Sequence, residues 1–232
     1  MPLRLRLCAQ PESRLGFRLF PDSHLRSEIQ HNIRGLKADA MAYNISIGAC
    51  SQGKHPERAL TLLKEMEERG FRPDTVTYNA TISACSKSKH FEKAVQLLGQ
   101  MQERGLNPDV ITHTAAINAC ARGKQLERAL QLLEAMQRVG LKPNAITYSA
   151  AISACANGKQ PERALQLLNE MQQKGLKPSA ITYNAAISAC EKGKKPEKAL
   201  ALLAQMRTKD LRPGVISYNA AISACAKGHQ ME

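Results

Sequence analysis

Apolar residues in the segment 91–103 recur at every third or fourth position and form one continuous stripe. They are Phe91, Ala94, Val95, Leu97, Leu98 and Met101. This spacing predicts an amphipathic helix that buries one side. Glu92 lies in its first turn and Arg104 in its last, which suits the helix dipole. Gly105, followed by Pro108, is typical of a helix stop.

The preceding segment, 76–87, predicts a first helix with a less regular pattern. Tyr78, Ile82 and Cys85 lie at i, i+4 and i+7, and Thr81 lies on the same side. Its Thr, Asn and Ser residues are mediocre helix formers, so we expect neighbouring helices to stabilise it. Ala replaces Thr81 at 116, 151, 186 and 221, which would let helices approach closely. SKSKH joins the two helices as a turn.

This two-helix pattern recurs along the chain at a fixed interval. VTYNATISAC ends at Cys85 and ITYNAAISAC ends at Cys190. The cysteine step is 35 residues throughout, at Cys50, Cys85, Cys120, Cys155, Cys190 and Cys225. Proline takes the column of Phe91 in three copies, as the first helical position allows, at Pro56, Pro161 and Pro196. A fixed period of this length indicates stacked helix–turn–helix repeats. The sequence therefore predicts an all-α fold, a right-handed α-solenoid of about five full repeats with partial repeats at both ends.

The expected organisation follows from this period. Whole repeats are expected at 40–74, 75–109, 110–144, 145–179 and 180–214. A partial sixth repeat is expected at 215–232 and a degenerate partial repeat at 22–39. The segment 1–21 carries four Arg against one Glu and lacks a compact apolar centre. It resembles an organelle targeting segment more than a secretory signal, with a degenerate repeat as the alternative.

Charge and composition narrow the function. The formal net charge is +13, which favours polyanionic partners, nucleic acid first. A basic surface that only aids solubility is the alternative. Aromatic content is 4% with no Trp, so the core must be built from Leu, Ile, Ala and Met. No apolar run approaches a membrane span, so no membrane partner is expected.

The cysteines and histidines suggest no chemistry. Six of the seven cysteines share one repeat position. Packed helices lie about 8–10 Å apart, whereas bridged Cα atoms need less than about 7 Å. With no CxxC motif, we expect small buried core residues in a reducing compartment. The six His follow no ligand spacing, and neither a catalytic triad nor a Gly-rich phosphate loop occurs. We expect no catalytic residue, metal or cofactor, and no enzyme activity.

A 35-residue hairpin with a VTYN head, an EKAL-type second helix and a G-L-x-P-D end resembles the pentatricopeptide repeat family over residues 22–232. The tetratricopeptide repeat has a period of 34 and a Trp-containing pattern that is absent here. The resemblance implies sequence-specific binding of single-stranded RNA, roughly one base per repeat. It further implies an adaptor in plastid or mitochondrial RNA processing, stability, editing or translation.

The resemblance also implies which residues contact RNA. The residue after the Tyr recognises the base edge: Asn44, Asn79, Thr114, Ser149, Asn184 and Asn219. The last residue of the repeat completes each pair: Asp74, Asp109, Asn144, Ser179 and Gly214. The residue two before the Tyr packs on the base face: Met41, Val76, Ile111, Ile146, Ile181 and Ile216. Short polar side chains suit a base edge, and variation between repeats concentrates in the two recognition columns.

The family's pairing rules imply an order of bases. Asn with Asp in the first two repeats resembles a uracil reader, and Thr with Asn in the third an adenine reader. Ser with Ser departs from the common pairs and would tolerate a purine. Asn with Gly would accept a pyrimidine with poor discrimination. The implied site is U-U-A-purine-pyrimidine, with the RNA 5′ end toward the N-terminus.

Cations line the turn after the first helix. One column holds Lys54, Lys89, Lys124, Lys159 and Lys194. A second row, two residues earlier, holds Lys87, Arg122, Lys192 and Lys227, and is broken by Gln52 and Asn157. Such a ladder beside the base-recognising helix is expected to contact phosphates. The alternative is that cations simply favour a helix C-terminus.

Two other functions stay open at the level of sequence. A protein-interaction scaffold is the alternative to RNA binding, although the small polar columns argue against it. The targeting arm of a nuclease is another. We also expect other RNA-processing proteins as partners, and self-association through the C-terminal end, where the last first-helix has no polar cap.

Overall fold

The computed structural model describes residues 40–88 and 90–228, and within these the chain forms α-helices and no strand. The helices are α2 (Ala40–Gly53), α3 (Pro56–Glu68), α4 (Thr75–Lys87), α5 (Phe91–Glu103), α6 (Val110–Arg122), α7 (Leu126–Arg138), α8 (Ala145–Asn157), α9 (Pro161–Gln173), α10 (Ala180–Lys192), α11 (Pro196–Thr208) and α12 (Val215–Gly228). The prediction of an all-α repeat solenoid is confirmed. The expected targeting segment 1–21 and partial repeat 22–39 lie outside the described residues.

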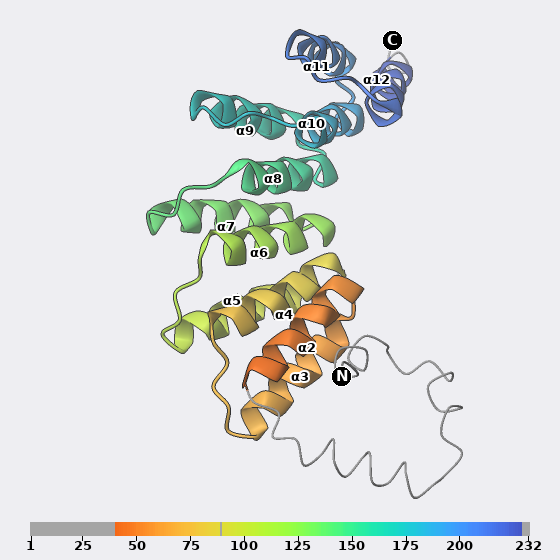
Figure 1. Cartoon of the computed structure of the whole chain (residues 1–232). Helices are drawn as coiled ribbons and strands as arrows, with labels where there is room; N and C mark the ends of the chain where they lie inside the picture. Colours follow the sequence, from red (N-terminus) through yellow and green to blue (C-terminus); the bar gives the residue numbers. More distant parts are fainter. Residues whose placement is uncertain (1–39, 89, 229–232) are drawn as a thin grey trace, which may run out of the picture.

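The helices stack into a two-layered array that rises from α2 to α12 (Figure 1). The first helices, α2, α4, α6, α8, α10 and α12, each pack directly on the next one. Each second helix packs on its own first helix and on the following first helix. Among the described helices, consecutive second helices meet only through long polar side chains, such as Gln137 of α7 with Glu170 of α9 at 3.3 Å and Lys198 of α11 with Glu162 of α9 at 3.3 Å. The first helices therefore form a continuous inner layer, and the second helices form a looser outer layer.

Small residues explain why the first helices pack so closely. Ala116, Ala151 and Ala186 are fully buried at the position that Thr81 takes in α4. Tyr78 and its counterparts in α2, α8 and α10 fill the space beneath them. The expectation that neighbours, rather than helix propensity, stabilise these helices agrees with this burial.

The second helices contribute the rest of the core along the predicted stripe. In α5, Ala94, Leu97, Leu98 and Met101 are buried. The methionine column is fully buried throughout: Met66, Met101, Met136, Met171 and Met206. The cysteines within the described residues are free thiols, as expected, and those from Cys50 to Cys190 lie in the same core. Cys225 differs from the other described cysteines because it is only half-buried, on α12.

The described turns show positive φ at two positions of the repeat. Gly70, Gly105, Gly140 and Gly175 end the second helices with φ between 73° and 82°. Asp210 takes the same position with φ of 56°. The second position falls on the lysine column of the turn, with φ between 54° and 59° at Lys54, Lys124, Lys159 and Lys194. A residue with a Cβ is disfavoured in this conformation, so the backbone conformation does not explain why lysine occupies this column.

Glycine before that lysine is required by packing. A Cβ at Gly158 would lie 2.6 Å from Leu126 Cδ2, at the start of the preceding second helix. Gly193 meets Pro161 in the same way. The junction between consecutive repeats is therefore tight at the C-terminal end of each first helix.

Candidate nucleic-acid interface

The last residue of each repeat is the N-cap of the next first helix. Asp74 Oδ1 accepts a hydrogen bond of 2.8 Å from the backbone N–H of Thr77, and Asp109 accepts an equivalent bond from Thr112. Asn144 and Ser179 cap α8 and α10 likewise. In each case the threonine hydroxyl accepts from the N-cap N–H, which completes a capping box. Sequence analysis missed this role, although the D-x-x-T spacing indicates it.

The residue after the Tyr lies beside this cap. Asn44 Nδ2 is 3.4 Å and 3.5 Å from the two carboxylate oxygens of Asp74. Asn79 Nδ2 is 3.4 Å from Asp109 Oδ2. The two predicted recognition columns, which are 30 residues apart in sequence, are therefore brought together in these repeats. Asn219 lies on α12 and is exposed.

A threonine or serine of the next repeat forms a hydrogen bond with the side chain of each Asn recognition residue that has a described following repeat. Thr77 Oγ1 lies 2.5 Å from Asn44 Oδ1, and Ser217 Oγ lies 2.6 Å from Asn184 Oδ1. Thr112 makes the same contact with Asn79. Sequence analysis did not single out this column, because its partner is 33 residues away in the chain.

The expected base-packing residues are all exposed apolar side chains. Met41, Val76, Ile111, Ile146, Ile181 and Ile216 are 60–72% exposed. Each lies three residues before a recognition residue, and hence on the same side of its helix. Exposed apolar side chains in a continuous row mark a binding surface rather than a core. The surface therefore offers an exposed apolar residue in every repeat, beside a contacting polar pair in the first two repeats.

Hydrogen bonds keep the aspartates of these pairs ionised. Partial burial alone would raise the pKa of Asp74. The bonds from the Thr77 N–H and hydroxyl and from Asn44 outweigh that effect and lower the pKa below its usual value. The pKa of Asp109 is lowered by the same balance, with Thr112 and Asn79 as donors. Both carboxylates are therefore acceptors at neutral pH.

The second cationic row contacts the preceding repeat. Lys87 Nζ donates to the Ser51 carbonyl at 3.0 Å, and Arg122 donates to the Lys87 carbonyl at 3.2 Å. Lys192 Nζ reaches Asn157 Oδ1 at 3.0 Å, and Lys227 Nζ lies 2.7 Å from Glu191 Oε1. These contacts support the alternative of cations at helix C-termini. Phosphate contact stays a prediction for this row.

The first lysine column lies at the turn, and the recognition pairs lie at the other end of the first helices. Lys54, Lys124, Lys159 and Lys194 are exposed. Lys89 lies outside the described residues. The second row is eight residues beyond the recognition residue, or about 12 Å along a helix that rises 1.5 Å per residue. A nucleotide could contact the recognition pair and the cationic row together only if its base lay at the start of the first helix and its phosphate at the end.

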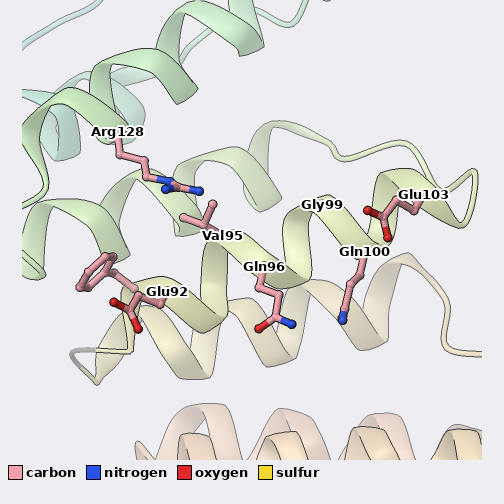
Figure 2. Close-up of a pocket in the computed structure, with 8 residues that line it drawn as sticks. Glu92, Val95, Gln96, Gly99, Gln100, Glu103 and Arg128 are labelled. Atoms are coloured by element: carbon pink, nitrogen blue, oxygen red, sulfur yellow. The ribbon is translucent and has the colours of Figure 1, made fainter.

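The outer face has grooves of a different character. Figure 2 shows one of about 460 Å³, along α5 and next to Arg128 of α7. Glu92 and Glu103 line it together with Gln96 and Gln100. An equivalent groove of about 680 Å³ lies between α9 and α11. Carboxylates on this face disfavour a polyanion, which leaves the inner surface as the candidate.

The described residues contain no group of His, Cys, Asp and Glu that could hold a metal ion. None of the described helices is long and apolar enough to cross a membrane.

Family models match nearly all of the described chain. The PPR repeat family model matches residues 38–87, 73–122 and 116–157. The pentatricopeptide repeat domain model matches residues 146–193 and 166–228. The chain belongs to the pentatricopeptide repeat family. The expected family is thus confirmed.

Solved pentatricopeptide repeat structures are similar to it. Maize PPR10 aligns with a TM-score of 0.64 and 29% identity over 89% of this chain. PPR10 in complex with an 18-nt psaJ RNA element aligns with a TM-score of 0.62 and 28% identity over 83% of this chain. The chain spans only 28–30% of the length of these PPR10 chains. No curated protein matched.

A more distant similarity supports the fold alone. The PPR domain of Arabidopsis thaliana protein-only RNase P 1, in complex with tRNA, aligns with a TM-score of 0.65 at 17% identity. That alignment covers 78% of this chain and 95% of the domain.

Proposed function

We propose that this pentatricopeptide repeat protein binds single-stranded RNA and selects roughly one base per repeat. The observation that carries the proposal is the recurring surface unit: an exposed aliphatic residue beside a polar pair formed across 30 residues. If the polar pair served only to cap the next helix, the column of exposed aliphatic residues beside it would have no explanation. RNA bound by the similar PPR10 structure supports the choice of ligand.

The pair of Asn44 and Asp74 has the hydrogen-bonding pattern that uracil needs. Asn44 Nδ2 is a donor for a uracil carbonyl oxygen, and the ionised Asp74 is an acceptor for the N3–H of uracil. Cytosine presents an acceptor at N3 and a donor at its amino group, so both contacts would be mismatched. Repeat 2 repeats this pattern with Asn79 and Asp109.

The pair of Thr114 and Asn144 differs in the way that adenine requires. Asn144 Oδ1 is occupied, because the N–H groups of Ile146 and Thr147 both donate to it at 3.0 Å. This leaves its Nδ2 as a donor for N1 of adenine. Thr114 lies beside it and can accept from the amino group of the base.

The last two repeats are expected to select less strictly. Ser149 Oγ donates to the Ala145 carbonyl at 2.8 Å and therefore offers a base only lone pairs, whereas the Ser179 hydroxyl can donate or accept. We expect this pair to tolerate either purine. Gly214 has no side chain, so Asn184 alone faces the fifth base. The proposed site is therefore U-U-A-purine-pyrimidine, covered 5′ to 3′ from the N-terminal repeat.

We propose that the chain acts as a non-enzymatic adaptor in plastid or mitochondrial RNA metabolism, in processing, stability, editing or translation. By covering a short single-stranded segment it would block nucleases or change local RNA structure. Family membership and the arginine-rich segment 1–21 support an organelle location. Imaging of a C-terminal fluorescent fusion tests this, and a diffuse cytosolic signal would contradict it.

The decisive experiment exchanges the recognition pair of repeat 2 for that of repeat 3. Asn79→Thr with Asp109→Asn keeps an N-cap on α6, because Asn144 already caps α8. Anisotropy titrations with UUAAU and UAAAU, at two salt concentrations, should show a preference that moves from the first RNA to the second. The reverse exchange, Thr114→Asn with Asn144→Asp, is the matched control and should change preference at the third base only.

Two outcomes would overturn the proposal. Equal and strongly salt-dependent binding to every sequence would leave only phosphate contacts and exclude base selection. An absence of binding even at low salt would favour the protein-interaction scaffold instead.

A further inference from the structure

We propose that the hydroxyl at the third position of each first helix orients the recognition residue of the preceding repeat. The positioning residues are Thr77, Thr112, Thr147, Thr182 and Ser217. This inference rests on the proposed function and deepens it. Each of these residues is 0% exposed, so none of them contacts the RNA itself.

The contact recurs at every junction of the described repeats. Thr77 and Asn44 are 2.5 Å apart, and Ser217 and Asn184 are 2.6 Å apart, measured between side-chain oxygens. In the hydroxyl repeats, Thr114 and Thr147 are 2.7 Å apart, and Ser149 and Thr182 are 2.6 Å apart. The remaining junction pairs Asn79 with Thr112. A packing accident would not give a hydrogen bond at all five junctions.

In the asparagine repeats, this contact decides which way the side-chain amide faces. Thr77 Oγ1 accepts the N–H of Asp74 at 3.2 Å, and its single proton lies between two acceptors, Asn44 Oδ1 at 2.5 Å and Asp74 Oδ1 at 2.8 Å. Asn44 Oδ1 carries no proton, so the threonine hydroxyl must supply the one in their contact. The reversed amide would place Oδ1 of Asn44 against the carboxylate of Asp74, two acceptors with no proton between them. The hydroxyl and the carboxylate therefore hold Asn44 with one Nδ2 hydrogen toward Asp74 and the other available to a base. This is the orientation that selects uracil over cytosine.

In the third repeat the same hydroxyl has the opposite polarity. Thr147 Oγ1 donates to Asn144 Oδ1 at 3.0 Å, which uses its proton. It must then accept the proton of Thr114 across their 2.7 Å contact. Thr114 is left with lone pairs for the base, and so accepts from an amino group. The N-cap bond itself is common to both kinds of repeat. The difference lies in the recognition residue: an asparagine oxygen takes its proton from the buried hydroxyl, whereas Thr114 supplies a proton of its own.

The fifth repeat shows the contact without a carboxylate. Ser217 Oγ donates to Asn184 Oδ1 and accepts the N–H of Gly214 at 3.2 Å. Gly214 contributes no side chain, so the orientation of Asn184 depends on the serine. We therefore expect Ser217→Ala to reduce the discrimination of pyrimidines at the fifth base.

The test uses a displacement between the mutated repeat and the affected base. Thr77 belongs to the repeat that recognises the second base, but it contacts the residue that recognises the first. Thr77→Val should lower the U-over-C affinity ratio at the first base about fivefold, as expected for one lost hydrogen bond. The ratio at the second base should not change. Thr77→Ser should restore the wild-type ratio.

Thr81→Ala is the matched control. Its hydroxyl donates to the Thr77 carbonyl, and other repeats carry alanine at this position. It should leave both ratios unchanged. An unchanged ratio at the first base in Thr77→Val would overturn the inference. Equal losses at both bases would do so as well, since they would indicate a general loss of structure.

A measurement on the free protein separates this inference from the proposed function. The NMR signals of the Asn44 side-chain amide should indicate a rigid group in the wild type and a mobile one in Thr77→Val, with Asn79 unaffected. A rigid Asn44 in that variant overturns the positioning role, whatever RNA does. If Asn44 loosens but the wild type binds every RNA equally, the base-selective function fails and the positioning role stands.

Discussion

Asp109 caps a helix and is proposed to recognise a base, and substitutions can separate the two roles. It caps α6 through the N–H of Thr112 at 2.8 Å, and it lies 3.4 Å from the amide of Asn79. Asp109→Ala removes both contacts and should cost about 1 kcal/mol of unfolding free energy, the usual cost of a lost N-cap. Asp109→Asn keeps the cap, as Asn144 does in α8, and should cost much less.

The pH dependence gives a second check on the same residue. The lowered pKa of Asp109 means that its ionised form is favoured in the folded state. Its contribution is therefore fully present above the unfolded pKa of about 3.9 and is lost as the pH falls through the folded value. The difference between wild type and Asp109→Ala should shrink below about pH 4.

Urea unfolding followed by circular dichroism measures the free energies of unfolding, and hydrogen exchange shows which helices lose protection. Because each repeat contacts mainly its neighbours, the loss of protection should be greatest in α6. An Asp109→Asn variant as unstable as Asp109→Ala would refute the capping argument. So would a difference that persists undiminished at pH 3.

Three further outcomes are expected. Asp210→Gly should stabilise the chain by about 0.5–1 kcal/mol in thermal unfolding, because φ is 56° there, and Gly175→Asp should do the reverse. In a Cys8→Ser background, Cys225 should be the thiol of the described repeats that reacts quickly with Ellman's reagent, because it is only half-buried. Burial raises the pKa of the other described thiols and so lowers their thiolate fraction. The pKa reaches about 11 at Cys85, Cys120, Cys155 and Cys190. Fast reaction of a second one would contradict this. Neutralising three cations of the second row should reduce the salt slope of RNA binding by about 2, whereas an equal loss of charge on the exposed loops should not. The two triple variants carry Gln at Lys87, Arg122 and Lys192, and at Arg72, Lys142 and Lys177. Equal slopes for the two variants would remove the row from the interface.

The period and the apolar stripes were enough to predict the helices and the core. The stripe from Ala94 to Met101 is buried as the spacing indicates. The recognition columns also follow from resemblance and within-chain variation, because they occupy fixed positions in every repeat. The hydrogen bond between Asn44 and Thr77 could not be predicted from the sequence, because these two residues meet only when two repeats stack.

The capping role was missed for a different reason. The repeat boundary was placed after Asp109, so that residue was assigned to the end of one unit rather than to the start of the next helix. Its D-x-x-T spacing was available in the sequence. The contacts of Lys87 and Arg122 were not, because they depend on how far each repeat is displaced relative to the one before.

The N-cap role limits which residues a recognition pair can use. The last position of the repeat holds Asp, Asn, Ser or Gly, and these are the residue types that helix N-caps prefer. A residue that recognised a base by a longer side chain, such as Gln or Arg, would leave the N–H groups of the next helix without an acceptor. Under the proposed function, specificity at one base and stability at the following junction are thus set by the same side chain. A change of the recognised base is therefore least costly between Asp and Asn, where the cap is kept.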